Sequence, residues 1–224
     1  MYSHAQAGIP VRLIHITIRV LFFLLVLNSF SLQAQRFNAG LMLGGVASQV
    51  DGDTYEGYHK FGYLGGGYVL LQVSPHSSFQ MELEYIQKGS RRNDTSVTGG
   101  TEYLLRLHYI EIPVLYQYTF KKRFYFEAGP AADITVGSLE MINGAVPPTT
   151  VPLRPVTLTG IFGFGVYLTN HLRLNVRANY SLMSIRSEND YSGYRRMLFE
   201  VGQYNNVLSC SILWDFKAKE LNNW

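Results

Sequence analysis

The feature that most constrains this chain is a strict alternation of apolar and polar residues within several short segments. From Leu172 to Leu182 every second residue is apolar, and the residues between them are arginine, asparagine or serine. Successive side chains of a β-strand point to opposite faces. Such a segment therefore places charge on one side of a sheet and hydrocarbon on the other, which predicts strands that separate two very different environments.

Eight segments show this period-two pattern to some degree. They are Phe37–Gly45, Phe61–Val73, Phe79–Tyr85, Tyr103–Phe120, Phe124–Val136, Val156–Leu168, Leu172–Leu182 and Asn206–Phe216. Within Tyr103–Phe120 the apolar residues change phase half-way, from odd to even positions. A change of phase next to a proline is typical of a β-bulge, and we expect one near Ile110–Pro113.

The links between these segments alternate strictly between long and short. In chain order they are Ser48–His59, Ser74–Ser78, Gly89–Glu102, Lys121–Lys122, Ser138–Pro155, Thr169–His171 and Ile185–Tyr204. In an antiparallel arrangement this alternation gathers all long loops at one end and all tight turns at the other. That layout is typical of bacterial outer-membrane barrels, which have short periplasmic turns and longer outer loops.

Two all-β folds fit the pattern: a membrane barrel with its apolar face outward, and a soluble lipocalin-like barrel with its apolar face inward. Lysine is rare on the polar faces, and aromatic residues gather at segment ends, as at Tyr116, Phe120 and Trp214. Aromatic belts mark membrane interfaces. We therefore predict an all-β fold, an eight-stranded antiparallel up-and-down transmembrane β-barrel of OmpA-type size, with the soluble barrel as the alternative.

The N-terminus has the composition of a leader. Residues 1–35 contain two arginines, no acidic residue, and an unbroken apolar run from Val20 to Leu27. That run is too short for a transmembrane helix, which needs about 20 apolar residues, and fits a secretory signal peptide. We expect residues 1–34 to be a signal peptide cleaved after Ala34, residues 35–216 to form the barrel, and residues 217–224 to form a short tail.

Charge argues against a nucleic-acid partner. The formal net charge is +3, and removing the two arginines of the leader leaves about +1. Electrostatic binding to nucleic acid needs clustered lysine and arginine. The single cysteine, Cys210, has no partner in the chain for a disulfide, so stability must come from the core, the hydrogen bonds or a bilayer.

Five motifs follow one another through about the first half of the mature chain: Gly45–Asp53, Gly57–Gly62, Met81–Ser90, Leu107–Leu115 and Glu127–Pro130. As a set they resemble the PorT-like outer-membrane β-barrel family of Bacteroidetes. The resemblance implies an outer-membrane barrel in the cell envelope. It assigns no activity, although the founding member is connected with type IX secretion. Such barrels commonly end on an aromatic residue, and here both Phe216 and Trp224 are candidates for that assembly signal.

The polar faces of the predicted strands carry charges of both signs. They are Glu82, Glu84, Glu127, Asp133, Arg173 and Arg177. An eight-stranded barrel has an interior just wide enough for side chains, and buried charges persist when they are paired. We interpret these six residues as a structural ion-pair and hydrogen-bond network inside the barrel, with no wide pore, and we expect Arg177 to pair with Glu127 or Asp133.

The outer loops are the predicted interaction surface. Tyrosine and arginine are favoured at interfaces, and the candidates are Tyr55, Tyr58, Arg91, Arg92, Tyr191, Tyr194, Arg195 and Arg196. The partners we expect are outer-membrane lipids and other envelope or secretion proteins. The alternative is a lipid-modifying enzyme that would use Asp51, Asp53, His59 or Ser96 in these loops. No catalytic, metal-binding or cofactor motif is recognised, so we assign no catalytic residue, metal or cofactor.

Overall fold

The structure is a computed structural model that describes residues 37–53, 57–92, 102–148, 151–186, 195–197 and 200–219. Eight of its strands form the barrel: β1 (Phe37–Asp51), β2 (Lys60–Gln72), β3 (Ser77–Arg92), β4 (Tyr103–Phe120), β5 (Phe124–Ile142), β6 (Val156–Tyr167), β7 (Leu172–Ser181) and β10 (Tyr204–Asp215). Two short strands, β8 (Arg195–Met197) and β9 (Glu200–Gly202), form a separate two-stranded sheet. The predicted all-β class is confirmed.

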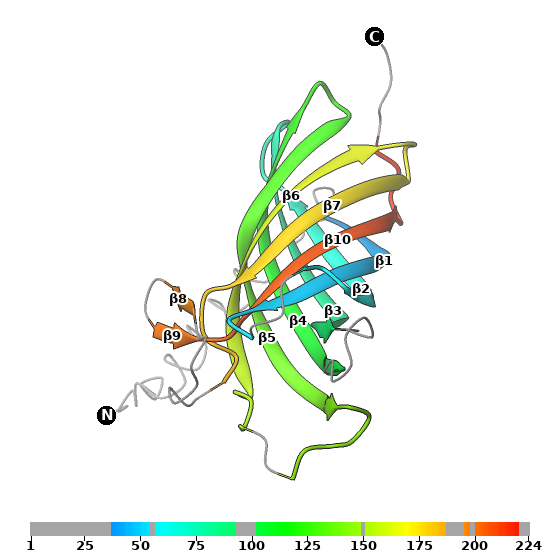
Figure 1. The fold of residues 1–224 in the computed structure, drawn as a ribbon. Coiled ribbons are helices and arrows are strands. Elements are labelled where there is room, and N and C mark those ends of the chain that lie inside the picture. The colour runs from blue at the N-terminus through cyan, green and yellow to red at the C-terminus, as the bar shows by residue number, and fades with distance from the viewer. Residues whose placement is uncertain are drawn as a thin grey trace, which may run out of the picture. The chain divides into compact units, whose positions relative to one another are not determined.

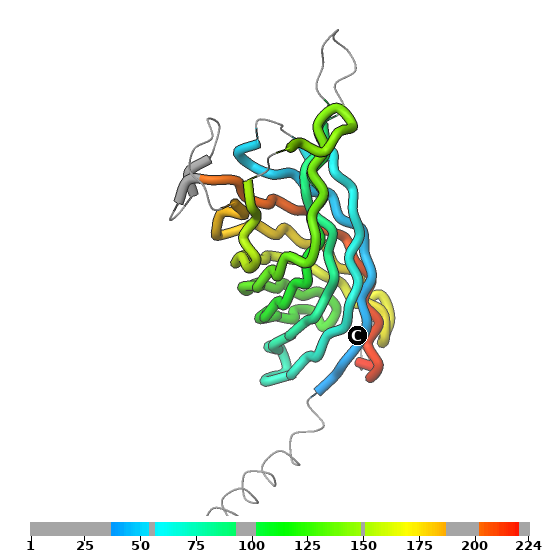
Figure 2. Tube along the Cα trace, turned by 90° about the horizontal axis from the view of Figure 1, so that it is seen from below, coloured from blue at the N-terminus to red at the C-terminus, as the bar shows by residue number. Residues whose placement is uncertain are grey.

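The eight strands form one closed antiparallel barrel in up-and-down order, with β1 beside β10 (Figures 1 and 2). The β1–β10 register runs from Gly40 opposite Asp215 to Asp51 opposite Tyr204, so the two ends of the barrel sequence close the sheet. The tightest link is the turn at Lys121 and Lys122, whose φ angles are 46° and 57°. Phe120 pairs with Phe124, so the two strands are joined by a three-residue hairpin link, 121–123. The predicted alternation of short and long links is confirmed.

The prediction of a bulge in Tyr103–Phe120 near Ile110–Pro113 is wrong, because the extra residue lies on the neighbouring strand β5. β4 alternates without a break, with odd-numbered residues facing inward from Tyr103 to Thr119. The register shift lies between His108 and Tyr109 of β4 and leaves Val136 of β5 as the extra residue. The apparent phase change arose because β4 carries apolar side chains on its inner face toward the long-loop end and on its outer face toward the short-turn end.

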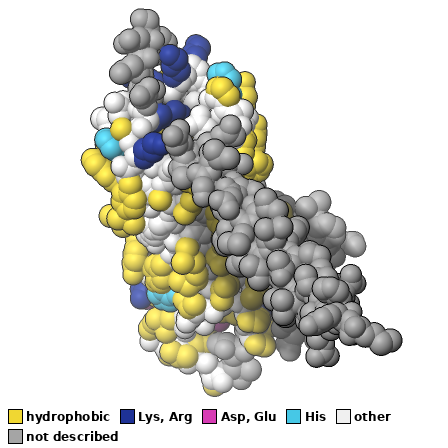
Figure 3. All heavy atoms as spheres, turned by 180° about the vertical axis from the view of Figure 1, so that it is seen from behind, with side chains coloured by type: hydrophobic (Ala, Val, Ile, Leu, Met, Phe, Trp, Pro, Cys, Tyr) yellow, Lys and Arg dark blue, Asp and Glu magenta, His cyan; other side chains and the backbone are white. Residues whose placement is uncertain are grey.

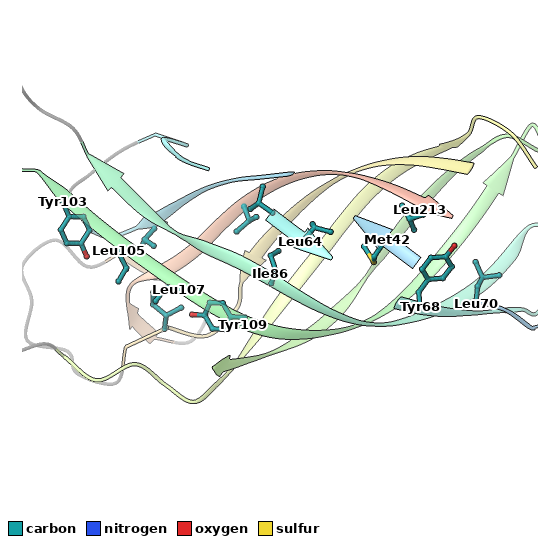
Figure 4. Packing of buried hydrophobic residues seen from close by; sticks show 14 residues of the cluster. Met42, Leu64, Tyr68, Leu70, Ile86, Tyr103, Leu105, Leu107, Tyr109 and Leu213 are labelled. Atoms are coloured by element: carbon teal, nitrogen blue, oxygen red, sulfur yellow. The ribbon is translucent and has the colours of Figure 1, made fainter. Parts of the chain in front are cut away.

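The interior toward the long-loop end consequently contains an apolar cluster. Inward side chains of β4, including Leu105 and Leu107, pack in one cluster with Leu64, Ile86 and Val207. Figure 4 shows Tyr103 and Leu105 at one end of this cluster and Leu70 and Leu213 toward the other. Hydrocarbon therefore lines part of the interior near the outer loops, beside the Arg186–Glu140 ion pair, whereas the three cationic centres described below occupy the middle and the turn end.

The outer wall carries the large apolar side chains. Leu43 is 69% exposed and Phe61 is 75% exposed, and each of the eight barrel strands contributes exposed hydrophobic residues. On the side drawn in Figure 3, hydrophobic side chains run along much of the wall while lysine and arginine gather mainly at one end. A soluble barrel would bury this apolar set, so the lipocalin-like alternative is wrong. No helix among the described residues is long and apolar enough to cross a membrane.

The outward position of Val176 provides the first test. Val176 on β7 faces outward beside Cys210 of β10. Val176→Arg should lower the free energy of unfolding by about 2–4 kcal/mol if the site lies near the bilayer midplane. Urea titration of the protein in lipid vesicles measures this, with Val176→Ala as the control that keeps the position uncharged.

The native Cys210, which is exposed on the same face, allows that face to be tested by chemical labelling without any substitution. A lipid-soluble photoreactive reagent should label it in vesicles, whereas a charged water-soluble thiol reagent should leave it unmodified. The reverse labelling would contradict the assignment of this face to lipid.

Candidate functional site

Arg177 lies at the centre of the barrel interior between two carboxylates from distant strands. Its Nη2 lies 2.6 Å from Glu82 Oε1 and its Nη1 2.7 Å from Glu82 Oε2, which is a bidentate contact. Its Nε donates to Glu127 Oε1 at 2.5 Å. Arg177 on β7 thus bridges β3 and β5 across the lumen. All three side chains are buried, and bidentate arginine–carboxylate contacts are among the strongest hydrogen bonds in proteins.

Lys88 forms a second centre nearer the long-loop end. Its Nζ donates to Asp133 Oδ2 at 2.7 Å and also forms an ion pair with Glu111. Thr159 Oγ1 donates to the same oxygen of Asp133, and Asn179 Nδ2 donates to Glu111. These contacts join β3, β4, β5, β6 and β7 through one buried ammonium group.

Arg173 forms a third centre at the short-turn end. Its Nη2 donates to Asp215 Oδ1 at 3.2 Å and to Gln80 Oε1 at 3.1 Å. The guanidinium carbon lies 4.9 Å from the ring centroid of Tyr68 and 5.4 Å from that of Tyr125. Aromatic faces attract cations at this range. The guanidinium is therefore held by one carboxylate, one amide and the surrounding tyrosine rings.

The structure places all six predicted network residues inside the barrel, where each is buried. Of the two partners expected for Arg177, Glu127 is found, whereas Asp133 pairs with Lys88. Glu84 lies opposite Glu111 in the β3–β4 register, and its Oε2 has no hydrogen-bond partner. The face pattern left the choice between Glu127 and Asp133 open because it assigns residues to the lumen without giving their height in it.

Three members of the network escaped sequence reasoning. Lys88 lies beyond the end of the predicted segment Phe79–Tyr85, but β3 continues to Arg92. Glu111 lies where the phase of β4 appeared to change, and Asp215 is the last residue of β10. Continuing the odd–even alternation of β4 through Pro113 would have placed Glu111 on the inner face.

The segment after β10 lies against the turn end of the barrel. The backbone N–H of Phe216 donates to Ala39 O at 2.8 Å and that of Lys219 donates to Asn170 O at 2.8 Å. The Lys219 ammonium lies 3.8 Å from the centroid of the Tyr167 ring. Burial and the nearby Arg173 lower the pKa of Lys219 to about 8. The tail therefore brings a further cation to the mouth of the lumen beside the turns.

The structure places the predicted outer-loop residues in different elements. Arg91 and Arg92 are exposed but belong to the end of β3, not to a loop. The Tyr58 hydroxyl donates to Asn206 Oδ1 at 2.7 Å, which ties its loop to β10; burial and the nearby Asp51 raise its pKa. Arg195 and Arg196 belong to β8, so the last link contains a small sheet. Tyr55, Tyr191 and Tyr194 lie outside the described residues.

The side chains of the enzyme alternative are not assembled into a site. Asp51 Oδ2 accepts a hydrogen bond from the Tyr180 hydroxyl at 2.8 Å, which is a structural contact between strand ends. His59 lines a groove on the outer wall that is described below, and Ser96 lies outside the described residues. Within the described part of the chain, no group of three or more His, Cys, Asp or Glu side chains is arranged to hold a metal ion.

Comparison with known families agrees with this architecture. A family model described as outer membrane protein beta-barrel domain matches residues 31–187, which is more than half of the 224 residues. The chain belongs to this family. It is therefore a small outer-membrane β-barrel protein, and its lumen, filled by the network above, is not a wide pore. A search of curated protein sequences returned no match.

Solved structures share the fold at low sequence identity. Ail, the attachment invasion locus protein of Yersinia pestis, is 11% identical, with 80% of this chain and 98% of that chain covered and a TM-score of 0.43. Neisserial surface protein A is 12% identical, with 80% and 97% covered and a TM-score of 0.44. OprG from Pseudomonas aeruginosa is 12% identical, with 81% and 95% covered and a TM-score of 0.39.

The bridging position of Arg177 generates the second prediction. Arg177→Ala leaves two buried carboxylates, Glu82 and Glu127, without their cation, so we expect a loss of about 3–5 kcal/mol in unfolding free energy. Urea titration in vesicles measures it. The triple variant Arg177→Met, Glu82→Gln, Glu127→Gln removes all three charges and should recover much of the loss. A triple variant no more stable than Arg177→Ala would contradict a role based on charge pairing.

Proposed function

We propose that this protein is a structural and interaction component of the outer membrane, an accessory of an envelope or secretion assembly that acts through its outer rim and not through its lumen. The observation that carries the proposal is the closed interior. Three cationic centres, Arg173, Arg177 and Lys88, bridge strands across the barrel at successive levels. A lumen occupied in this way leaves the outer end and the outer wall as the surfaces available to partners.

The outer end has the side chains that a partner surface needs. Arg91 and Arg92 are exposed at the end of β3, and arginine is enriched in protein interfaces. β8 and β9 add a small sheet in the last long link. Together with Tyr55, Tyr191 and Tyr194 of the neighbouring loops, these residues are our candidates for contacting another envelope protein.

The finer assignment is to the PorT-like branch of outer-membrane barrels, on the motifs named above. It includes export by a signal peptide cleaved after Ala34 and an envelope location. In this proposal the protein has no enzymatic activity, because its polar side chains at the outer end serve the fold: Asp51 accepts from Tyr180, and Glu140 pairs with Arg186. Its partners are outer-membrane lipids and protein components of the assembly.

Conductance gives the third prediction. The purified protein in planar lipid bilayers should show no sustained large channel, because ion-paired side chains occupy the lumen. Single-channel recording measures this, and a trimeric porin recorded in the same bilayers is the positive control. A stable porin-like conductance would contradict the filled interior and with it the central support of the proposal.

The fourth prediction concerns the partner surface. A photo-cross-linking amino acid placed at Arg92 should give a discrete protein adduct in living cells, identified by mass spectrometry. The same amino acid placed at Lys122, in a turn at the opposite end of the barrel, should not give this adduct. Arg91→Gln with Arg92→Gln should weaken the adduct formed from a cross-linker at Tyr194. Absence of any adduct from the outer end would overturn the interaction role.

A further inference from the structure

A groove on the outer wall near the long-loop end is lined by several cationic side chains. Its volume is about 360 Å³, and it lies on strands β2, β3 and β4 with a contribution from β5. Its charged lining residues are Lys60, Arg91, Arg106 and Glu102. Cations therefore outnumber the carboxylate by three to one among its described lining residues, and His59 adds a titratable ring.

The strand register explains why the cations meet there. Arg106 of β4 lies opposite Gly89 of β3, and Leu104 lies opposite Arg91. Gly89 brings no side chain to the wall, and its φ of +138° favours glycine; a Cβ there would stand 2.0 Å from Leu105 O. Arg106 Nε is buried without a hydrogen-bond partner.

Lys60 reaches the same place from the neighbouring strand. Its Nζ donates to Gln87 Oε1 at 3.0 Å, and Gln87 lies two residues before Gly89 on β3. Cations from three adjacent strands thus line one hollow of the outer wall.

The outward side chains of β3 change from apolar to aromatic and then to polar and cationic toward the long loops. A bilayer changes in the same order, from hydrocarbon through the interface to the headgroups. From the turn end its outward residues are Phe79, Met81, Leu83, Tyr85, Gln87, Gly89 and Arg91. Tyr85 hydrogen-bonds His108 of β4 and packs 5.5 Å from the Tyr63 ring of β2, measured between centroids. Tyrosine clusters of this kind mark the boundary between hydrocarbon and headgroups. Arg106 lies two residues, or about 7 Å along the strand, beyond His108 toward the loops.

We propose that this groove binds the phosphate group of an anionic lipid in the outer leaflet. The inference rests on the part of the proposed function that places the long loops at the cell surface. Phosphate oxygens would accept hydrogen bonds from Arg106, Lys60 and Arg91, as charge-assisted contacts. The exposed ring of Phe61, which also lines the groove, would contact the apolar part of the same lipid.

A lipid fits better than a free anion because the groove is amphipathic and open along the wall. A free phosphate would contact the cations but not the apolar ring of Phe61. A lipid would contact the cations through its phosphate and Phe61 through its apolar part. Its acyl chains would continue over the apolar surface formed by Leu83 and Met81, which are 60% and 58% exposed.

The test measures lipid binding to the full-length folded protein in neutral detergent by native mass spectrometry. The probes are a bisphosphorylated lipid A, the same lipid with its phosphates removed, and inorganic phosphate as a competitor. The phosphorylated lipid should remain bound, the dephosphorylated lipid should bind at least about tenfold more weakly, and millimolar phosphate should not displace the lipid.

Two variants localise the site. Arg106→Gln alone, and Lys60→Gln with Arg106→Gln, should each weaken binding of the phosphorylated lipid by about tenfold or more. Lys121→Gln with Lys122→Gln removes two exposed cations at the opposite end and should leave binding unchanged. The gel-mobility difference between unheated and boiled samples verifies that each variant is folded.

Equal binding in the Arg106 and Lys121–Lys122 variants would overturn the proposal, as would equal binding of the dephosphorylated lipid or displacement by inorganic phosphate. Binding is measured on the isolated protein, so its failure is independent of whether Arg92 finds a protein partner in cells.

Discussion

The need to pair every backbone hydrogen-bonding group in a medium without water governs this structure. An unpaired N–H or carbonyl in hydrocarbon costs several kcal/mol, so a sheet can span the membrane only when it is closed. The closing contact here is the pairing of β1 with β10, twelve residue pairs from Gly40–Asp215 to Asp51–Tyr204. Once the sheet is closed, alternation gives each strand one face for lipid and one for the lumen.

Closure at eight strands places charged side chains in a narrow interior, where each buried charge must be paired or hydrogen-bonded. Among the described residues, the middle and the turn end of the interior hold six buried carboxylates and three buried cations: Glu82, Glu84, Glu111, Glu127, Asp133 and Asp215 with Lys88, Arg173 and Arg177. Amide and hydroxyl donors supplement the cations: Gln117 and Asn175 donate to Glu127, and Thr159 donates to Asp133. The network joins strands that are not neighbours in the sheet, so it stabilises the cross-section of the barrel in addition to the backbone ladder.

The two ends of the molecule follow from the same constraint. At the turn end, Arg173 and Lys219 of the tail both lie against the ring of Tyr167. At the long-loop end an apolar cluster lies in the lumen beside the Arg186–Glu140 ion pair, and cations line the outer wall beyond the tyrosine–histidine cluster, toward the loops. A filled lumen combined with a chemically differentiated outer wall suits a protein that works by contact with lipids and envelope proteins, and not by conduction.

Most of the architecture could be predicted from the sequence, because alternation is a local property of each strand. Period two alone places Val176 and Arg177 on opposite faces of β7, and the scarcity of lysine and the aromatic segment ends indicate that the apolar face points outward. The alternation of link lengths implies the up-and-down order. Membership in an outer-membrane barrel family was likewise anticipated from motifs in the first half of the chain. The six predicted network residues could be assigned to one face in the same way.

Only the tertiary structure decided how those residues combine. Whether Asp133 meets Arg177 or Lys88 depends on stagger between strands, which no single strand encodes. The same holds for Glu111: its inward direction is a property of β4, but its contact with Lys88 comes from the β3–β4 register. The sequence did not predict the groove of Lys60, Arg91 and Arg106. Its cations lie on three different strands, and only the strand register brings them together beside Gly89. The sequence by itself sorted the side chains of each strand into two opposite faces, because alternation is local; closure and register determined which residues become neighbours.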